Sequence, residues 1–413
     1  MTSPAGTTSA ASRAFPLWAV VAAGCVIVAI NFGPRVSMGF FQIPLITERG
    51  WGRETYSLAM AIQNLMWGVG AVLFGGLADR FGTARVLSLG ALLYAAGLLV
   101  MAWAPQPIWL HVGGGIMVGL GVAASSFGIV MAAFGRSVSA EKRTMVFGYA
   151  TAAGSFGQFF FSPLTQGLIQ TYGWHDSLLI LAAIIGVIPL LSVLLRGKPA
   201  PKASAGHADQ TIAEALREAG GHGSYLLLAS GFFVCGFQLA FITVHFPAYI
   251  RDLGLDAKWG VIGLMLVGLF NVIGSLGSGV LGSRVSKRYL LAFIYVARSV
   301  AAAAFVLAPA SPASVVLFSA VMGLLWLSTV PPTNALVAVM FGTRYLALLG
   351  GIVFLSHQVG SFIGIWLGGY LYDLNKSYEP VWWIGIVLGL FAALVHLPIR
   401  EEAAIRPLAA PAE

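Results

Sequence analysis

Two arginines lie well inside long apolar stretches of this sequence, where a charged side chain needs a specific partner. Arg35 follows Pro34, whose ring interrupts helical hydrogen bonding and frees backbone carbonyls nearby. A guanidinium can form two parallel hydrogen bonds with a carboxylate, and no acidic residue lies close to Arg35 in the sequence. We therefore expect Arg35 to bind the carboxylate of a ligand. The alternative is that its side chain extends to the end of the stretch and into water.

Three further ionisable side chains share this setting. Arg298 either contacts the ligand or donates to backbone carbonyls and so holds helices together. His245 and His357 are candidates because an imidazole titrates near neutral pH, so it can bind a carboxylate when protonated and release it when neutral. The alternative for each histidine is a neutral ring that is hydrogen-bonded to a backbone carbonyl.

Uncharged polar side chains in the same stretches are weaker candidates. They could donate hydrogen bonds to a ligand, but buried amides also join helices to one another. The candidates of this kind are Asn64, Tyr149, Gln158 and Gln358.

Patterns typical of soluble enzymes are absent from the sequence. There is no G-x-x-x-x-G-K-[ST] loop for ATP, no spaced cluster of Cys and His for a metal, and no serine nucleophile motif. The two cysteines, Cys25 and Cys235, lie in apolar stretches and imply no disulfide. We expect a protein that is not an enzyme and needs neither a cofactor nor a metal.

The composition of the chain indicates that these candidate residues lie in a protein embedded in a lipid bilayer. Of 413 residues, 58% are hydrophobic and 9% are charged, whereas soluble domains carry about 25% charged residues. A chain with a mean hydropathy of +0.86 cannot cover a globule of this size with polar surface. The formal charge of +8 could indicate an acidic partner, but the positions of the basic residues explain it by membrane orientation. We expect no nucleic acid partner.

Apolar runs of about 20 residues, the length that crosses the hydrocarbon layer, predict an all-α protein with twelve transmembrane helices. The expected spans are 16–46, 55–78, 85–104, 109–133, 144–170, 174–195, 224–250, 258–282, 289–308, 312–341, 345–371 and 380–399. An even number of spans places both termini on one side, and the loops of that side hold most of the Lys and Arg. The positive-inside rule therefore predicts a multi-pass protein of the cell inner (plasma) membrane with both termini in the cytoplasm.

The expected organisation has two related halves. A disordered tail (1–15) precedes a six-helix bundle (16–195), and a cytoplasmic linker (196–223) leads to a second six-helix bundle (224–399) and a disordered tail (400–413). The linker segment TIAEALREAG could form a short surface helix. At a constant offset, Gly70, Gly75 and Arg80 correspond to Gly274, Gly279 and Arg284, which indicates a repeat.

The strongest motif is GGLADRFGTAR at residues 75–85. It resembles the G-x-x-x-D-R-x-G-R-R loop signature of the major facilitator superfamily, although Thr83 and Ala84 interrupt the basic run. The resemblance implies the major facilitator fold and a conformational latch between helices, made here by Gly75, Asp79, Arg80, Gly82 and Arg85 with Arg284 in the second copy. That copy, GVLGSRVSKR at 279–288, lacks the acid and the turn glycine, so we expect its latch to be weaker.

Three stretches resemble the monocarboxylate transporter branch of that superfamily. KRTMVFGYATAAG at 142–154 is similar to the pattern that opens its fifth helix, with the last glycine one place late. NFGPRVSMGFF at 31–41, and the seventh span from CGF (235–237) to HFPAY (245–249), look like bacterial relatives of the branch. The acidic-Gly-Gly-Trp signature is replaced by Pro16-Leu17-Trp18, and the Asp/Arg pair of animal members is replaced by Asn271 and Ser275.

The resemblance implies a secondary transporter that moves a small organic anion, of the monocarboxylate type, by alternating access. We expect a monomer in which Arg35 clamps the carboxylate and His245 and His357 assist. Because no acidic residue falls in the middle of a span, protons, if they are the coupling ion, must travel on histidine or on the substrate. Proton symport and anion exchange both fit. One alternative is an exporter of amphiphilic drugs or metabolites. An alternative of another class is a solute-binding membrane sensor, which would need a signalling domain.

Overall fold

The computed structural model describes residues 15–137, 140–197, 211–342 and 345–403. Nearly all of the two predicted disordered tails and the first part of the predicted linker lie outside these residues. The rest of the linker contains α10 (Ile212–Gly221), which confirms the expected short helix. Thr211 caps it, since its side chain accepts from the N–H of Glu214 and its own N–H donates back to that carboxylate.

The described residues form helices and no β-strand, which confirms the all-α prediction. The long helices are α1 (Leu17–Val36), α3 (Arg53–Phe81), α4 (Thr83–Trp103), α8 (Ala140–Ile185), α11 (Gly223–Asp252), α12 (Lys258–Gly282), α13 (Lys287–Leu307), α14 (Pro312–Leu325), α15 (Val330–Phe341), α16 (Leu346–Asn375) and α17 (Glu379–His396). The shorter segments are η1 (Met38–Phe41), α2 (Gln42–Arg49), α5 (Pro107–Leu110), the π-helical η2 (His111–Met117), α6 (Val118–Ala124), α7 (Phe127–Ser137), α9 (Ile188–Ser192) and η3 (Val193–Leu195).

Eleven stretches in the described part of the chain are long and apolar enough to cross a bilayer. One of them, Gly148–Leu195, has 48 residues. That is about 70 Å of helix, roughly twice the thickness of the hydrocarbon layer. Gly173 breaks this stretch with a φ of +78°, a conformation that favours glycine. The two parts are the expected fifth and sixth spans, so the twelve-span prediction is confirmed.

Several spans are not continuous α-helices. The first span passes from α1 through η1 to α2 and ends at Arg49, beyond the predicted end at residue 46. The fourth span contains a π-helical turn at Gly113, Gly114 and Gly115. The tenth span is interrupted at residues 326–329, between α14 and α15. These breaks position the polar groups described below.

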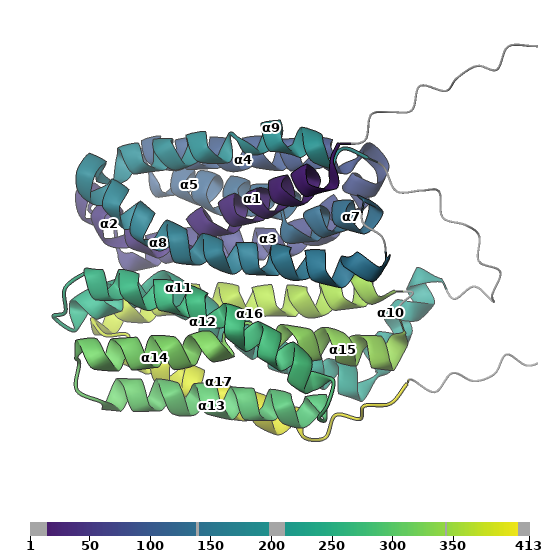
Figure 1. Cartoon of the computed structure of the whole chain (residues 1–413). Coiled ribbons are helices and arrows are strands. Elements are labelled where there is room, and N and C mark those ends of the chain that lie inside the picture. Colours follow the sequence, from purple (N-terminus) through teal and green to yellow (C-terminus); the bar gives the residue numbers. More distant parts are fainter. Residues whose placement is uncertain (1–14, 138–139, 198–210, 343–344, 404–413) are drawn as a thin grey trace, which may run out of the picture.

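The spans form two halves that lie against each other (Figure 1), with the helices up to α9 in one layer and those from α11 onward in the other. Each half has its own hydrophobic core. The halves meet where α3 packs along α16, α8 along α12, and η1 against α11. Small residues permit this approach: a Cβ added at Gly39 would lie 2.7 Å from the carbonyl oxygens of Thr243 and Val244.

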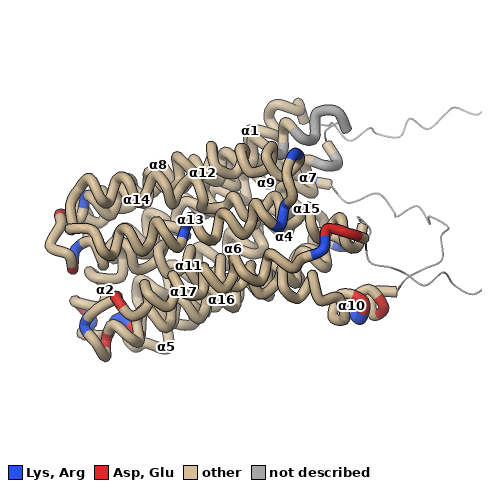
Figure 2. Tube along the Cα trace, turned by 90° about the horizontal axis from the view of Figure 1, so that it is seen from below, with Lys and Arg blue, Asp and Glu red and all other residues tan. Residues whose placement is uncertain are grey.

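Charged residues gather at the two ends of the bundle (Figure 2). We call these the α10 end, near which the described chain begins and ends, and the α2 end, which holds the α2–α3 and α11–α12 connections. The interior between the two ends is almost uncharged in the described residues, so the arginines within it are exceptional.

Candidate functional site

Arg35 lies in the last turn of α1, directly before the chain tightens into η1. Pro34 has no N–H to donate, which loosens the helix at this point. The guanidinium donates from Nη2 to Oδ1 of Asn64 on α3 and lies 4.2 Å from the centre of the Trp67 ring. Its Nε is buried and has no hydrogen-bond partner among the described residues. The contacts of Arg35 in the described residues are thus an amide and the rings of Trp67 and Phe32, while its Nε is left without an acceptor.

The depth of Arg35 decides between its two predicted roles. The helical path continues beyond it to Arg49, which is about 20 Å at roughly 1.5 Å per residue. An arginine side chain cannot span that distance to reach water at the α2 end. The guanidinium is directed across to α3 instead of along its own span. The geometry therefore favours a role inside the bundle.

Three other predicted residues are linked to Arg35 by a chain of hydrogen bonds that starts at Asn64. Asn64 also donates to its own helix, at the carbonyl of Met60 (2.9 Å). From the other half, Nε2 of Gln358 donates to the backbone carbonyl of Asn64 (3.1 Å), and Nδ1 of His357 lies 3.0 Å from Oε1 of Gln358. We call Arg35, Asn64, Trp67, His357 and Gln358 the Arg35 cluster. It spans both halves through α1, α3 and α16.

Aromatic rings frame the cluster. Trp67 contacts Phe354 edge-on with ring centres 5.1 Å apart, and Phe354 stacks on His357 at 5.9 Å. Phe232 of α11 covers His357 from 4.9 Å. A cation and several polar donors among apolar rings are the composition expected of a small-molecule site.

The space beside Arg35 is nearly closed. A cavity of about 10 Å³ is lined by Arg35, Met38, Met60, Gln63, Asn64, Ala240, Thr243, Val244 and Ile365. This is room for about one water molecule. An organic anion of several atoms would therefore require the two halves to move apart.

Arg298 is placed outside the Arg35 cluster. It is fully buried on α13, where its Nε donates to the carbonyl of Leu325 (3.1 Å) and its Nη2 donates to the carbonyls of Leu325 and Trp326. Its Nη1 lies 3.2 Å from Sγ of Cys235. These contacts satisfy the carbonyls at the end of α14, where the tenth span is broken. They match the helix-holding role that the sequence left open as the alternative to ligand contact.

His245 lies near the α2 end, with both ring nitrogens engaged. Its Nε2 is 2.9 Å from the carbonyl of Ile365, so that nitrogen carries a proton. Its Nδ1, 3.0 Å from the hydroxyl of Tyr378, then accepts in the neutral ring. The structure therefore places both ring nitrogens of His245 in hydrogen bonds, the arrangement expected of a neutral ring, and away from Arg35.

The last two predicted contacts lie on α8. Gln158 is buried between the halves, where Nε2 donates to the carbonyl of Leu264 on α12 (3.2 Å) and Oε1 has no partner. Tyr149 is 52% exposed and does not join the Arg35 cluster. Gln158 lies where α8 packs against α12, so it could contact only a ligand that binds between these two helices.

The predicted latch lies at the α10 end, between α3 and α4. Gly82 has a φ of +91°, which explains the glycine at this turn. Gly75 faces open space, and Arg80, Arg85 and Arg284 are exposed. The side chain of Asp79 lies outside the described part of the structure, so the latch stays a prediction.

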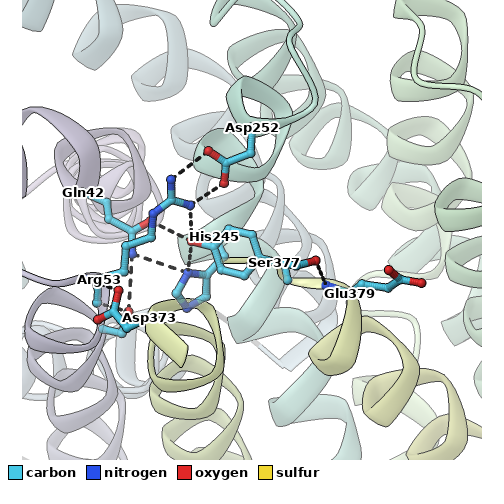
Figure 3. A network of polar contacts seen from close by, with 9 residues as sticks. Gln42, Arg53, His245, Asp252, Asp373, Ser377 and Glu379 are labelled. Carbon is cyan, nitrogen blue, oxygen red and sulfur yellow. Dashed lines mark hydrogen bonds and ion pairs between the residues drawn. The ribbon is translucent and has the colours of Figure 1, made fainter. Parts of the chain in front are cut away.

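Apart from His245, sequence reasoning missed a second group of polar residues, at the α2 end (Figure 3). Arg53 of α3 donates to both carboxylate oxygens of Asp252 on α11, from Nη1 (2.5 Å) and Nη2 (2.8 Å). Nη1 also donates to the Tyr378 hydroxyl (2.9 Å), and Asp373 of α16 accepts from the N–H of Arg53 (3.1 Å). We call Arg53, His245, Asp252, Asp373 and Tyr378 the Arg53 cluster.

These residues were missed because charges at span ends are expected in any membrane protein. A physical signal was available. Arg53 opens a helix, while Asp252 and Asp373 lie at or near the ends of helices. Each charge opposes the dipole of its own helix, and such placement indicates a partner elsewhere.

The family model for the Major Facilitator Superfamily matches residues 23–364. The MFS-type transporter YcxA of Bacillus subtilis is 24% identical over 381 residues, covering 89% of this chain and 91% of that protein. Monocarboxylate transporter 13 of Rattus norvegicus is 27% identical over 400 residues, covering 92% of this chain and 89% of that protein.

Solved structures agree on the fold. A bacterial homolog of the human lysosomal transporter Spinster, in an inward-facing and unoccupied conformation, superposes with a TM-score of 0.73 at 13% identity, covering 92% of this chain and 96% of that one. A D-xylose-proton symporter gives a TM-score of 0.69 at 14% identity, covering 93% and 97%. With a family model that covers most of its length and the same arrangement of helices, this chain belongs to the Major Facilitator Superfamily.

Proposed function

We propose that this transporter moves a small organic anion of the monocarboxylate type across the inner membrane by alternating access. Relatives that cover most of the chain include monocarboxylate transporters 13 and 4. The Arg35 cluster supports the same class of substrate, since it joins the two halves around a cation. Sites between the halves are where such a motion exposes a ligand to each side in turn.

The observation that carries the proposal is the unsatisfied guanidinium of Arg35. Its Nε has no hydrogen-bond partner although it is buried, and its described partner is an amide. A buried donor that lacks an acceptor is costly, and a charged donor more so. A substrate carboxylate would supply the missing acceptor and the missing negative charge together.

The neighbours of Arg35 have distinct roles in this proposal. Asn64 orients the guanidinium, and Gln358 and His357 approach from the other half, so the substrate would contact both halves. We assign His245 to the Arg53 cluster and Arg298 to the broken tenth span, and neither to substrate contact. Gln158 and Tyr149 are the least supported contacts.

The chain acts as a monomer in this proposal, with the α10 end in the cytoplasm. Basic residues in the loops of that end favour this orientation by the positive-inside rule. Because acidic side chains of the described residues lie at helix ends, His357 or the substrate itself would carry a coupled proton. Proton symport and anion exchange both remain compatible with the site.

The test is uptake of labelled lactate and acetate into proteoliposomes, with and without a pH gradient. The variants are Arg35→Ala, Arg35→Lys and the control Arg49→Ala, which removes an arginine of the same span that lies against Trp174. We expect saturable uptake by the parent and by Arg49→Ala, and its loss in Arg35→Ala. Arg35→Lys should retain only a small fraction, because lysine cannot form the two-pronged contact.

The gradient separates the two coupling modes. Uptake that an inward proton gradient accelerates indicates symport, whereas uptake that requires anion inside the vesicle indicates exchange. No carboxylate uptake by a folded parent protein would refute the substrate class. It would favour the exporter of amphiphilic compounds instead.

A further inference from the structure

The first turn of α3 lacks a cap of its own. Its N-cap residue is Gly52, which has no side chain to accept the free N–H groups that open a helix. Asp373 of α16, in the other half, accepts them instead: Oδ1 from the N–H of Arg53 (3.1 Å) and Oδ2 from the N–H of Glu54 (2.8 Å). One half of the molecule therefore caps a helix of the other half.

Gly52 leaves room for this carboxylate. A Cβ at Gly52 would lie 2.5 Å from Oδ2 of Asp373. The backbone at Gly52 has φ −75° and ψ 163°, an extended conformation that any residue adopts. The glycine is thus needed for the approach of Asp373 and not for the path of the chain.

A second contact between the halves uses the side chain of Arg53. The Arg53 guanidinium, 8% exposed, holds both oxygens of Asp252 and the hydroxyl of Tyr378, and it lies 3.6 Å from the centre of the Tyr372 ring. Every one of these partners belongs to the other half. The cap uses backbone N–H groups and the ion pair uses a side chain, so either can be removed without deleting the other.

We propose that the cap and the ion pair together form a lock that closes the α2 end, and that α3 has its helix cap only in the closed state. Opening would leave Arg53 beside the positive end of α3 and Asp373 beside the negative end of α16, both unfavourable. The closed state is therefore favoured by the cost of separating the two charges from their partners. The inference rests on the proposed alternating access, but it does not depend on which substrate is carried.

The test measures how often the α2 end opens. Cysteine replaces Ala240, a 7% exposed residue that lines the cavity beside Arg35, in a background with Cys25→Ser and Cys235→Ser. A membrane-impermeant maleimide is added from the α2 side, and the labelling rate is recorded. No substrate is needed, so failure of the lock and failure of the carboxylate assignment give different results.

Two variants test the cap. Asp373→Ala removes the acceptor, and Gly52→Ala displaces it sterically while leaving every charge in place. We expect each to raise the labelling rate about fivefold, which is the typical cost of a lost N-cap expressed as a population change. Arg53→Ala breaks the ion pair and should raise the rate on the order of a hundredfold. Asp252→Asn should give a smaller increase in the same direction.

Asp256→Asn is the matched control. Asp256 lies at the same end but pairs with Lys258 of its own half, 3.6 Å away, so its loss should leave the rate unchanged. A cysteine at Val72, which faces Gly351 toward the α10 end, reports the opposite side. Labelling there should fall when the α2 end opens more often, whereas a poorly folded variant would label faster at both positions.

Unchanged labelling at residue 240 in Gly52→Ala and Asp373→Ala, with both proteins monodisperse, would overturn the cap. Unchanged labelling in Arg53→Ala would overturn the ion-pair part of the lock. An increase in Asp256→Asn as large as in Arg53→Ala would show that any lost charge at this end loosens it, and would overturn the lock as a specific device.

Discussion

Two arginines of the first half face the second half, and their partners differ. Arg53 contacts a carboxylate through two nitrogens, a hydroxyl and the face of a ring. Arg35 contacts one amide and two rings, and within the described part of the chain its Nε is unsatisfied. An arginine whose guanidinium is paired with acceptors stabilises the observed conformation, whereas one with an unsatisfied N–H can still bind a ligand. The difference separates a structural contact from a candidate site better than depth or charge alone.

Asn64→Asp would give Arg35 a carboxylate partner of the kind that Arg53 has. Asn64→Asp places a carboxylate where the amide oxygen now accepts from Nη2. We expect carboxylate binding to weaken on the order of a hundredfold or more, because the new anion competes within the site. Binding is measured by lactate uptake and by thermal shift with lactate, with Asn64→Leu as the control.

Thermal stability without ligand supplies the second half of that test. Asn64→Asp should unfold at a higher temperature than the parent, since a buried charge gains its counter-ion. A less stable Asn64→Asp protein that still transports normally would contradict the contrast between the two arginines.

The reverse change breaks the ion pair that Arg53 makes. Arg53→Ala leaves Asp252 unpaired, and breaking a buried pair typically costs about 3–5 kcal/mol. Since the Asp252 side chain is 30% exposed, we expect a smaller loss, about 1–3 kcal/mol. Thermal unfolding in detergent measures it, with Arg49→Ala for comparison. Arg35→Ala should cost less than Arg53→Ala, and the opposite order would refute the distinction.

A smaller effect is expected from Tyr378→Phe. The hydroxyl accepts from Arg53 and lies 3.0 Å from Nδ1 of His245, while burial raises the pKa of this phenol well above its ordinary value and so keeps it neutral. Its loss removes hydrogen bonds that are worth about 1 kcal/mol each. Unfolding temperatures of the single variant, of Arg53→Ala and of the double variant measure the coupling. Strict additivity would show that the hydroxyl acts independently of Arg53.

The smallest effect concerns Glu401, at the α10 end and far from both clusters. Burial raises its pKa, but hydrogen bonds from the Ser286 hydroxyl and the N–H of Arg288, with Lys287 nearby, outweigh it and hold the pKa below its ordinary value. Its stabilisation is present above the unfolded-state pKa and is lost as pH falls through the folded-state value. Between pH 7 and pH 4 the parent should lose stability relative to Glu401→Gln, by less than about 1 kcal/mol.

Span number could be predicted from the sequence because it follows from local composition, whereas the direction of the Arg35 side chain was left open between a ligand and the end of its span. Apolar runs set the helices, and Pro34 beside Arg35 marked the irregular turn in the first span. Asn64, His357 and Gln358 were also predicted, although their linkage to Arg35 through Asn64 depends on how α3 and α16 pack.

The role of Arg298 and the whole Arg53 cluster depend on distant packing. Arg298 meets carbonyls that become free because the tenth span breaks at 326–329. Pro331 and Pro332, at the start of α15, favour that break, but the approach of Arg298 from α13 depends on packing.

The partners of Arg53 lie far along the chain, on α11 and α16. The one indication in the sequence was that Arg53, Asp252 and Asp373 each lie at or near a helix end whose partial charge has the same sign as their own.

The unpaired charge of Arg35 also has an electrical consequence. An empty site carries one positive charge, whereas a site that holds a monoanion is neutral. Moving one elementary charge through a potential of 100 mV changes the energy by about 2.3 kcal/mol. Membrane voltage would then change the rate at which the empty transporter switches between its two orientations. It would have almost no effect on the same switch with the substrate bound. A cell could thus alter turnover through its membrane potential even when the transported cargo is the only mobile charge.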